Sequence, residues 1–231
     1  MQATDVMTTN VITIQADTGV REIARLLLKH RISAVPVVDV DQRVLGMVSE
    51  GDLVRRAEND TSARHSWWLE VIFSAKDMTG EYIKTHGRKA GDVMTRDVVG
   101  VTEDTQLYKI AGLLEKHHIK RVPVTRDGRL VGIVSRANLL HGLAAKGVES
   151  SGPTSSDDQT IRKKLLRALS KEAGLDTALI NVIVHDGVVQ FWGLCGSSTE
   201  KKAAQIAAEN TPGVKAVENH LGQIPPGVSA Y

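Results

Sequence analysis

The same stretch of sequence occurs twice in this chain of 231 residues. Val6-Met7-Thr8 returns as Val93-Met94-Thr95, an offset of 87 positions, and the same offset relates Val35-Pro36-Val37 to Val122-Pro123-Val124. A one-residue difference in the following turn changes the offset to 86. A period this long, with the same chain breakers and apolar positions in both copies, indicates a duplicated domain and not a solenoid. The duplication predicts a pseudo-symmetric pair with sites between its two halves.

Composition limits what such a pair can be. Apolar residues make up 42% and charged residues 24% of the chain, which is typical of a soluble globular protein. The formal net charge of +2 shows no concentrated basic excess, so we expect no nucleic-acid partner. Cys195 is the one cysteine, which excludes an internal disulfide and a cysteine-based zinc site. The sequence has no signal-peptide pattern and no apolar window of about 18 residues, so we expect a cytoplasmic protein without a transmembrane segment.

Each copy predicts the order strand, helix, strand, strand, helix, and the fold class is therefore α/β. The strands are predicted from β-branched or apolar runs between turn residues, and the helices from apolar side chains at helical spacing. Asp17 or Thr18 is expected to cap the first helix. Each of the two strands that contain a proline must place it where no backbone N–H is needed for pairing with a neighbouring strand. The expected strands include residues 11–14, 32–38, 44–48, 98–101 and 119–124, and residues 105–116 are expected to form the helix of the second copy.

Ser49 and Asp52 stand where the last helix of the first copy begins, and they are the candidates for binding chemistry. A serine hydroxyl and unpaired backbone N–H groups at a helix start can meet a phosphate. An aspartate one turn later can accept hydrogen bonds from both hydroxyls of a ribose. The alternative is that Ser49 is an ordinary helix cap and Asp52 a partner of the helix dipole. The duplication and the adjacent Val-Pro-Val strand favour the binding interpretation.

Two strand-helix-strand-strand-helix units each carry Val-Pro-Val followed by Gly-x-x-Ser, and then x-x-Asp in the first copy and x-x-Asn in the second. This arrangement resembles the tandem CBS domains of a Bateman module. The resemblance covers roughly residues 1–145. It implies a regulatory homodimer that binds an adenosyl ligand in clefts between the repeats: AMP, ADP, ATP or NAD, with S-adenosylmethionine as a further candidate, and no metal. Carried over by position, Ser49 faces phosphate and Asp52 faces ribose. The residues implied to line the adenine slot are Thr13, Ala34, Val35 and Pro36.

The second copy departs from the pattern at Asn138, where the family has its ribose-binding aspartate. An amide can bond a diol, but with one acceptor oxygen and no charge, so the second site is weaker, differently selective or empty. Lys120, Arg121 and Arg136 are candidates for charge on a bound phosphate, or they are surface cations. The implied lining residues of the second site are Arg121, Val122, Pro123, Ser135, Arg136 and Asn138.

An insert between the copies, residues 58–92, has no counterpart in either repeat. It concentrates two tryptophans and a phenylalanine within residues 66–73. Tryptophans are enriched at interface anchors, so the insert is a candidate for partner binding. The alternative is a helix that covers apolar surface of the module or lies in its dimer contact. Scattered histidines here and at His117-His118 do not have the spacing of a metal site.

Residues 146–156 are rich in Gly, Ser and Pro and predict a flexible linker. Beyond it, residues 157–225 predict a helix, a hairpin turning at His185-Asp186-Gly187, a helix packed through Ala203, Ile206 and Ala207, and a strand. Asp-Gly-Val-Val-x-Phe-x-Gly and Pro-Gly-Val-x-x-Val-x-Asn resemble a BON domain, a small α/β module often proposed to associate with phospholipid or other macromolecules. Its basic first helix (Arg162, Lys163, Lys164 and Arg167) either touches anionic lipid or is a solvated face.

These interpretations divide the chain into repeat 1 (1–57), the insert (58–92), repeat 2 (93–145), the linker (146–156) and the BON-like domain (157–225). The leading hypothesis is a non-catalytic signal-transduction module in which adenine-nucleotide binding changes how the BON-like domain meets a partner. The alternative is a constitutive dimeric adaptor that binds phospholipid or protein without sensing a nucleotide. An enzyme is disfavoured, because no phosphate-cradling Gly-Lys loop, metal-ligand spacing or nucleophile elbow occurs.

Overall fold

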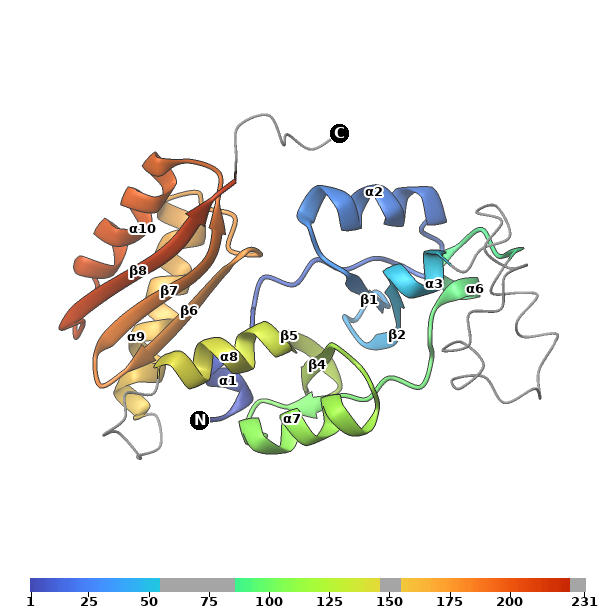
Figure 1. Ribbon diagram of the computed structural model, residues 1–231, viewed down its shortest axis with the longest axis horizontal. Coiled ribbons are helices and arrows are strands. Elements are labelled where there is room, and N and C mark those ends of the chain that lie inside the picture. Colours follow the sequence, from blue (N-terminus) through green and yellow to red (C-terminus); the bar gives the residue numbers. More distant parts are fainter. Residues whose placement is uncertain (55–85, 146–154, 225–231) are drawn as a thin grey trace. The chain divides into compact units, whose positions relative to one another are not determined.

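The computed structural model describes residues 1–54, 86–145 and 155–224 (Figure 1). These divide into two compact units: residues 12–54 with 86–98, and residues 1–11 with 99–224. The first unit is built around repeat 1, and the second contains repeat 2 and the C-terminal domain. The aromatic segment of the insert and nearly all of the linker lie outside the described residues. The domain boundaries given above stay a prediction.

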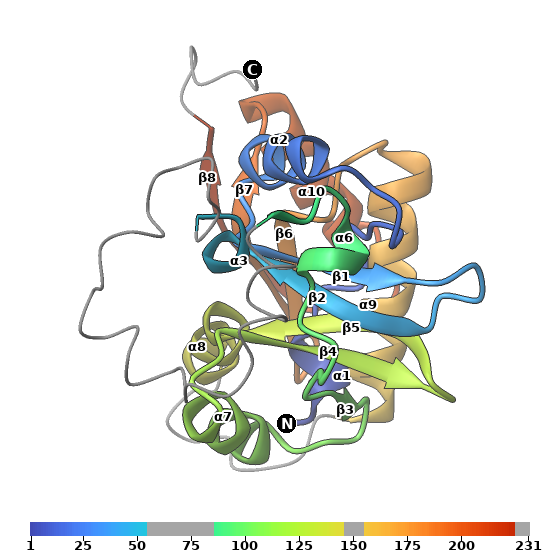
Figure 2. The same cartoon turned by 90° about the vertical axis from the view of Figure 1, so that its right-hand side faces the viewer.

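Repeat 1 is a helix, a hairpin and a short closing helix. The helix α2 (Val20–His30) has a strongly amphipathic sequence and buries Val20, Ile23 and Leu27. The hairpin pairs β1 (Ala34–Val38) with β2 (Val44–Ser49), and α3 (Glu50–Val54) continues directly from β2 (Figure 2). The core is aliphatic, as the scarcity of aromatic residues requires. It contains Ile14, Val20, Ile23, Leu27, Val35, Val37, Val48, Leu53, Ala90, Val93 and Met94.

The predicted strand at residues 11–14 is wrong, and Pro36 supplies the reason. Ile14 forms a single parallel bridge to Val37: the Ile14 N–H donates to the Pro36 carbonyl, and the Val38 N–H donates to Ile14. The next bond toward the N-terminus would need an N–H on Pro36, which proline lacks. The ladder therefore ends after one bridge. The expected cap at Asp17 or Thr18 is also wrong, because the N-cap is Gly19 and the Thr18 hydroxyl accepts a hydrogen bond from the Gln15 N–H.

Repeat 2 has the same plan. Its elements are β3 (Val101–Thr102), α7 (Leu107–Lys116), β4 (Arg121–Arg126), β5 (Arg129–Ser135) and α8 (Arg136–Ala145). The β3 strand lies parallel to β4, and β4 pairs antiparallel with β5. The predicted strand 98–101 is displaced, and the helix begins two residues later than expected, because Gln106 is its N-cap and Thr105 instead accepts a hydrogen bond from Thr102.

A short arm precedes each repeat, and each arm packs in the unit of the other repeat. The N-terminal arm, residues 1–8 with α1 (Ala3–Val6), bridges from Thr8 to Ile133 of β5. The second arm, residues 88–95 with α6 (Ala90–Val93), bridges from Thr95 to Met47 of β2. Each arm's methionine lies against a glycine of the hairpin, Met7 over Gly132 and Met94 over Gly46. The duplicated sequences therefore make the same contact twice.

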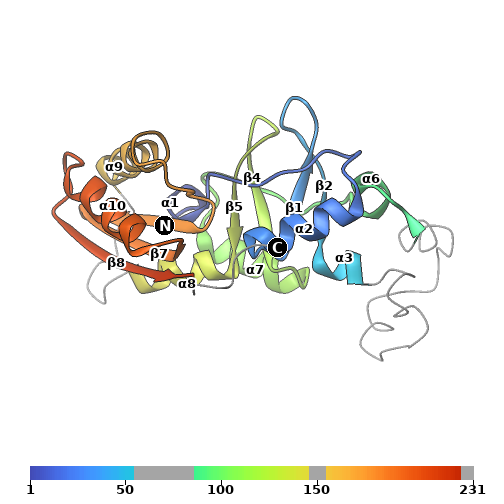
Figure 3. The same ribbon diagram turned by 90° about the horizontal axis from the view of Figure 1, so that it is seen from above.

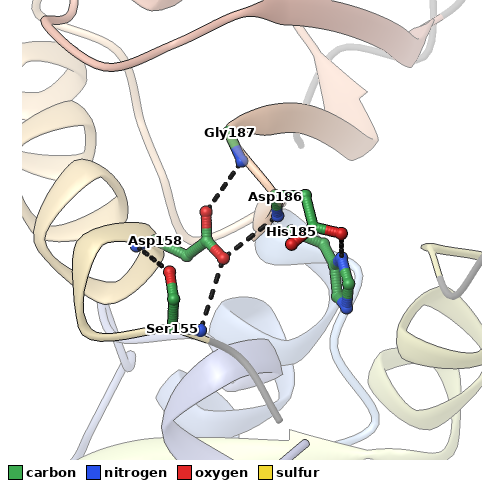
Figure 4. A network of polar contacts seen from close by, with 5 residues as sticks. All are labelled: Ser155, Asp158, His185, Asp186 and Gly187. Carbon is green, nitrogen blue, oxygen red and sulfur yellow. Dashed lines mark hydrogen bonds and ion pairs between the residues drawn. The ribbon is translucent and has the colours of Figure 1, made fainter. Parts of the chain in front are cut away.

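The C-terminal domain follows its predicted order. The helix α9 (Ser156–Arg167) runs on as a π-helical turn (Ala168–Glu172), and the sheet has the order β6 (Ile180–His185), β7 (Val188–Cys195), β8 (Ala216–Gln223). The helix α10 (Ser198–Glu209) connects β7 to the parallel strand β8. The predicted hairpin turn is confirmed, with positive φ angles at Asp186 and Gly187. In Figure 4 the carboxylate of Asp158 accepts hydrogen bonds from this turn and from Ser155.

The two faces of this sheet have different neighbours. On one face, α9 and α10 lie side by side over the sheet (Figure 3), and the core includes Leu165, Leu169, Val182 and Phe191. On the other face, Ile183 is fully buried in the core cluster of repeat 2. The strand β6 contacts both α1 and α8 there. The domain is thus packed on repeat 2 as part of the same unit.

Two expectations about its helices are wrong. Arg162 is only 6% exposed and does not belong to the basic outer face, whereas Lys163, Lys164 and Arg167 are exposed. In α10 the buried alanines are Ala204 and Ala208, and Ile206 is exposed, whereas Ala207 packs against the core as predicted. Both differences arise from which face of each helix is turned toward the sheet.

Candidate functional site

The first candidate site lies where the β1–β2 hairpin of repeat 1 meets α3. The start of β1 and the end of β2 are register partners, Ala34 opposite Ser49. The Glu50 N–H donates to the Ser33 carbonyl, which fixes the first residue of α3 beside the start of β1. Ser49 and Asp52 therefore stand on a rigid junction of strand and helix.

The two side chains are hydrogen-bonded to each other. Asp52 Oδ2 accepts from the Ser49 N–H at 2.8 Å and from the Ser49 hydroxyl at 2.6 Å. Both residues are half-buried. The Asp52 carboxylate accepts from the backbone N–H of Ser49, the residue that precedes α3, as the acidic side chain of a capping box does. The alternative of a structural role at the helix start is therefore also compatible with the structure. A carboxylate has about four lone-pair positions, so the same group has acceptor capacity for a diol.

The remaining predicted residues of the first site lie along β1. Val35 is fully buried in the core, and Ala34 and Pro36 are buried at the neighbouring positions of the strand. Thr13 precedes Ile14, whose N–H donates to Pro36, so Thr13 runs beside the proline strand. Since the core side of β1 is filled by Val35 and Val37, a ligand at this strand would meet its backbone and the side chains at Ala34 and Pro36. These assignments stay predictions.

The second candidate site repeats this geometry with an amide. Asn138 Oδ1 accepts from the Ser135 N–H at 2.8 Å and from the Ser135 hydroxyl at 2.6 Å. The Asn138 side chain also donates through Nδ2 to the Val6 carbonyl at 2.9 Å and to the Thr8 hydroxyl at 3.5 Å. Asn138 is 5% exposed. Its oxygen and nitrogen are therefore both engaged by the fold.

The cations predicted near the second site are differently placed. Arg121 is half-buried and is the register partner of Ser135, so it lies at the site. Arg136 is exposed, and its backbone N–H donates to the Lys120 carbonyl. Val122 and Pro123 are buried, and Val122 belongs to the core of repeat 2.

Sequence reasoning missed the polar contacts of Arg162. The guanidinium donates to the Met7 carbonyl at 2.6 Å and to the Val182 carbonyl at 2.7 Å. Burial lowers the pKa of Arg162 to about 10, and the nearby Asp5 acts in the opposite direction. The group therefore stays protonated at neutral pH. No sequence pattern marks this role, because Met7 lies 155 residues earlier in the chain.

Other kinds of site find no support in the part of the chain that the structure describes. There, no cluster of three or more His, Cys, Asp or Glu side chains is placed to hold a metal ion. In the same residues, every helix is too short or too polar to cross a bilayer. A groove between β3 and α7, lined by residues that include Thr102, Lys109 and Lys116, contains none of the predicted site residues.

Comparison with known proteins places this geometry in a family. The CBS domain model matches residues 3–59 and 90–145, and the BON domain model matches residues 157–224. The chain is 34% identical over 145 residues to the chloroplastic CBS domain-containing protein CBSX1 of Arabidopsis thaliana, covering 60% of this chain and 61% of that protein. It is 32% identical over 148 residues to the uncharacterized protein MJ1426 of Methanocaldococcus jannaschii, covering 57% of this chain and 85% of that protein.

A solved structure agrees with these sequence matches. The crystal structure of CBSX2 in complex with AMP superposes with a TM-score of 0.54 at 27% identity, over 62% of this chain and 97% of that chain. The two CBS segments and the C-terminal segment together account for most of the present sequence. The chain belongs to the CBS-domain family, with a tandem CBS pair followed by a BON domain.

Proposed function

We propose that the protein is a non-catalytic regulatory module that binds an adenine nucleotide through Ser49 and Asp52 of its first CBS repeat. One observation carries the proposal. A half-buried carboxylate is held at the junction of a strand and a helix, next to a serine hydroxyl and the Val-Pro-Val strand. The relative CBSX2, whose fold this chain shares, has been crystallised with AMP. AMP is therefore the first ligand to test, followed by ADP, ATP, NAD and S-adenosylmethionine.

The chemistry assigned to each group follows from the site. Asp52 accepts hydrogen bonds from the ribose hydroxyls, since it offers a negative charge and acceptor oxygens where β2 meets α3. The Ser49 hydroxyl donates to Asp52 in the structure. To bind a phosphate, this hydroxyl would have to donate to a phosphate oxygen in place of Asp52. The adenine ring would lie along β1 at Thr13, Ala34 and Pro36. Binding at this site would signal to a partner in the cytoplasm without any change in the nucleotide's bonds.

Replacing the carboxylate by an amide tests the proposal directly. Asp52→Asn keeps a side chain that can accept from Ser49, because Asn138 does so in the other repeat with the same distances. It removes the charge, and a hydrogen bond to a charged group contributes about 1.5–3 kcal/mol. AMP affinity should therefore fall roughly ten-fold to a hundred-fold. Calorimetric titration measures it, and Asp17→Asn, an exposed carboxylate of the same unit, is the control.

A thermal-shift panel checks ligand choice in the same samples. A ligand at about 100 times its Kd adds about 2.7 kcal/mol of stability, which a melting curve resolves. A wild-type protein that is stabilised by none of the five ligands, once carried-over nucleotide is excluded by mass spectrometry, would contradict the proposal. The constitutive adaptor would then take its place.

The proposal includes a homodimer formed through the CBS pair. Leu140 and Leu143 of α8 are 64% and 69% exposed, and Tyr108 of the neighbouring helix α7 is 71% exposed. Large apolar side chains gathered on adjacent helices are typical of a surface that a partner covers. Replacing both leucines by lysine should convert the dimer to a monomer in light scattering. Val40→Lys, at an exposed turn, is the control; a wild-type chain that is monomeric at micromolar concentration would rule the dimer out.

The adaptor remains the second candidate because of the BON domain's surface. Lys163, Lys164 and Arg167 of α9 are exposed, so three of the four predicted cations are available to an anionic lipid or protein. Co-sedimentation with anionic and with neutral vesicles separates these cases. Binding that needs anionic lipid and is lost when the three residues are replaced by glutamine would favour lipid contact.

A further inference from the structure

The end of the short helix α1 is held from two sides. Helices leave their last carbonyls without partners inside the helix, and such groups must be satisfied when buried. The Val6 carbonyl accepts from Asn138 Nδ2 of repeat 2, and the Met7 carbonyl accepts from the Arg162 guanidinium of the BON domain. Two neighbouring carbonyls of one chain segment are thus bonded to two different domains.

The Asn138 contact requires an amide. Its oxygen faces two donors from Ser135, and its nitrogen faces the Val6 carbonyl, so the network itself fixes which end is which. An aspartate at this position would place a carboxylate oxygen against the carbonyl oxygen of Val6. In repeat 1 the equivalent residue is Asp52, which has no amide N–H with which to donate to a carbonyl. The departure from the family pattern therefore has a structural cause at α1.

The BON domain contacts the same region through further polar and aromatic groups. Gln159 of α9 donates to Asp5 of α1 at 3.2 Å. Asn181 of β6 lies 3.3 Å from His141 of α8, and the ring of His141 stacks on Trp192 with centroids 5.2 Å apart. Ile183 completes the contact inside the core of repeat 2. The helix α1 and the helix α8 thus together form the surface of repeat 2 on which the BON domain packs.

We propose that Asn138 is a positioning residue that anchors α1 as the docking platform of the BON domain, and that repeat 2 in consequence has no ribose subsite. Binding a ribose at Asn138 would take its amide from the Val6 carbonyl and leave that carbonyl buried without its donor. The inference rests on the proposed function, and it deepens it: the protein binds one adenine nucleotide per chain, at Asp52. The second family position serves the attachment of the BON domain.

Two readouts on the full-length chain test the proposal. The first is the calorimetric stoichiometry of AMP: one per chain is expected, with unchanged affinity in Asn138→Ala. The second is acrylamide quenching of Trp192 in a Trp67→Phe, Trp68→Phe background, in which Trp192 is the one tryptophan left. Within residues 1–54, 86–145 and 155–224, the side-chain hydrogen bonds of Asn138 go to Ser135 and to the N-terminal arm. Nevertheless, Asn138→Ala should raise the quenching of Trp192. Arg162→Met should do the same, since it removes the donor to Met7.

Further variants keep the result interpretable. Asp52→Asn should weaken AMP binding without changing Trp192 quenching. The Asn138→Ala and Arg162→Met effects should be less than additive, because both release the same segment. Far-UV circular dichroism shows whether each variant is folded, and a destabilised Asn138→Ala is replaced by Asn138→Ser. Two nucleotides per chain, or a loss of one in Asn138→Ala, would overturn the proposal while leaving the proposed function intact. If no nucleotide binds at all, the proposed function fails, and unchanged Trp192 quenching in Asn138→Ala would independently refute the anchoring role.

Discussion

The carboxylate of Asp158 joins the first helix of the BON domain to its hairpin turn. It accepts hydrogen bonds from the N–H groups of Gly187 at 2.8 Å, Asp186 at 3.0 Å and Ser155 at 3.4 Å (Figure 4). Burial alone would raise the pKa of Asp158, but the hydrogen bonds from Gly187, Ser155 and Asp186 outweigh it and hold the pKa below its ordinary value. The ionised group is therefore favoured by folding.

Asp158→Asn should destabilise the protein by about 2 kcal/mol, since hydrogen bonds to a charged group are lost. The pKa is lower in the folded state than in the unfolded one, so this stability is present above the unfolded pKa of about 3.9 and is lost as pH falls through the lower folded pKa. Urea unfolding between neutral and acidic pH measures both effects. Asp157→Asn, an exposed neighbour, is the control. Equal stability of wild type and Asp158→Asn at neutral pH would contradict the assignment.

Individual residues were predictable from sequence where their partners are close in the chain. The turn at Asp186-Gly187 was predicted and is formed. Ser49 and Asp52 are three residues apart and hydrogen-bonded to each other, whereas the ligand contacts predicted for them stay predictions. From the sequence, Arg162 was assigned to an outer basic face. Its hydrogen-bond partner, the Met7 carbonyl, belongs to another domain and could not be recognised from the sequence. Only the three-dimensional packing of α9 on β6 and α1 reveals that this cation is buried.

The arms are the elements whose contacts test the duplication most directly. At Gly46 an added Cβ would lie 2.9 Å from the Thr95 carbonyl oxygen, and at Gly132 it would lie 3.2 Å from the Thr8 carbonyl oxygen. Each glycine therefore allows an arm's backbone to approach the hairpin closely. In repeat 1, a larger side chain at Gly46 would disturb the two backbone hydrogen bonds between Met47 and Thr95, each 2.9 Å long.

Gly46→Ala and Gly132→Ala should each destabilise the protein by roughly 1–3 kcal/mol, as overpacking does. Gly46→Ala should have the larger effect, because its Cβ lies closer to backbone. Gly112→Ala is the matched control: it lies in α7, and an added Cβ meets nothing within 4 Å. This control should stabilise the helix by about 1 kcal/mol. Chemical denaturation gives all three values, and a neutral Gly46→Ala would disprove the close approach of the second arm.

At the scale of elements, the proline strands account for both the success and the failure of sequence reading. The runs around Pro36 and Pro123 were predicted as strands, and they are β1 and β4. The same proline limits the pairing of the segment beside it, which was predicted as a strand at residues 11–14 and forms a single bridge. Alternating apolar residues indicate that a segment is buried. They do not indicate whether the neighbouring strand has a backbone N–H that can donate a hydrogen bond.

At the scale of the whole molecule, the duplication and the C-terminal domain were readable from sequence, but the exchange of the arms was not. Val6-Met7-Thr8 and Val93-Met94-Thr95 are identical, and each hairpin offers a glycine, so either arm suits either repeat. The packing of the BON domain on repeat 2 was also missed. It includes Ile183, which looks in sequence like any apolar residue of a buried strand.

Ile183 and Val182 provide the last prediction, because neighbouring residues of β6 face opposite sides of the sheet. Val182 belongs to the core of the BON domain, and Ile183 belongs to the core of repeat 2. Ile183→Ala should cost about 2–5 kcal/mol and should lower hydrogen-exchange protection in β4 and β5 of repeat 2. Val182→Ala, the control, should act first on amides of the BON domain beneath α9. If Ile183→Ala leaves β4 and β5 fully protected, repeat 2 has a core of its own and the BON domain is merely tethered to it.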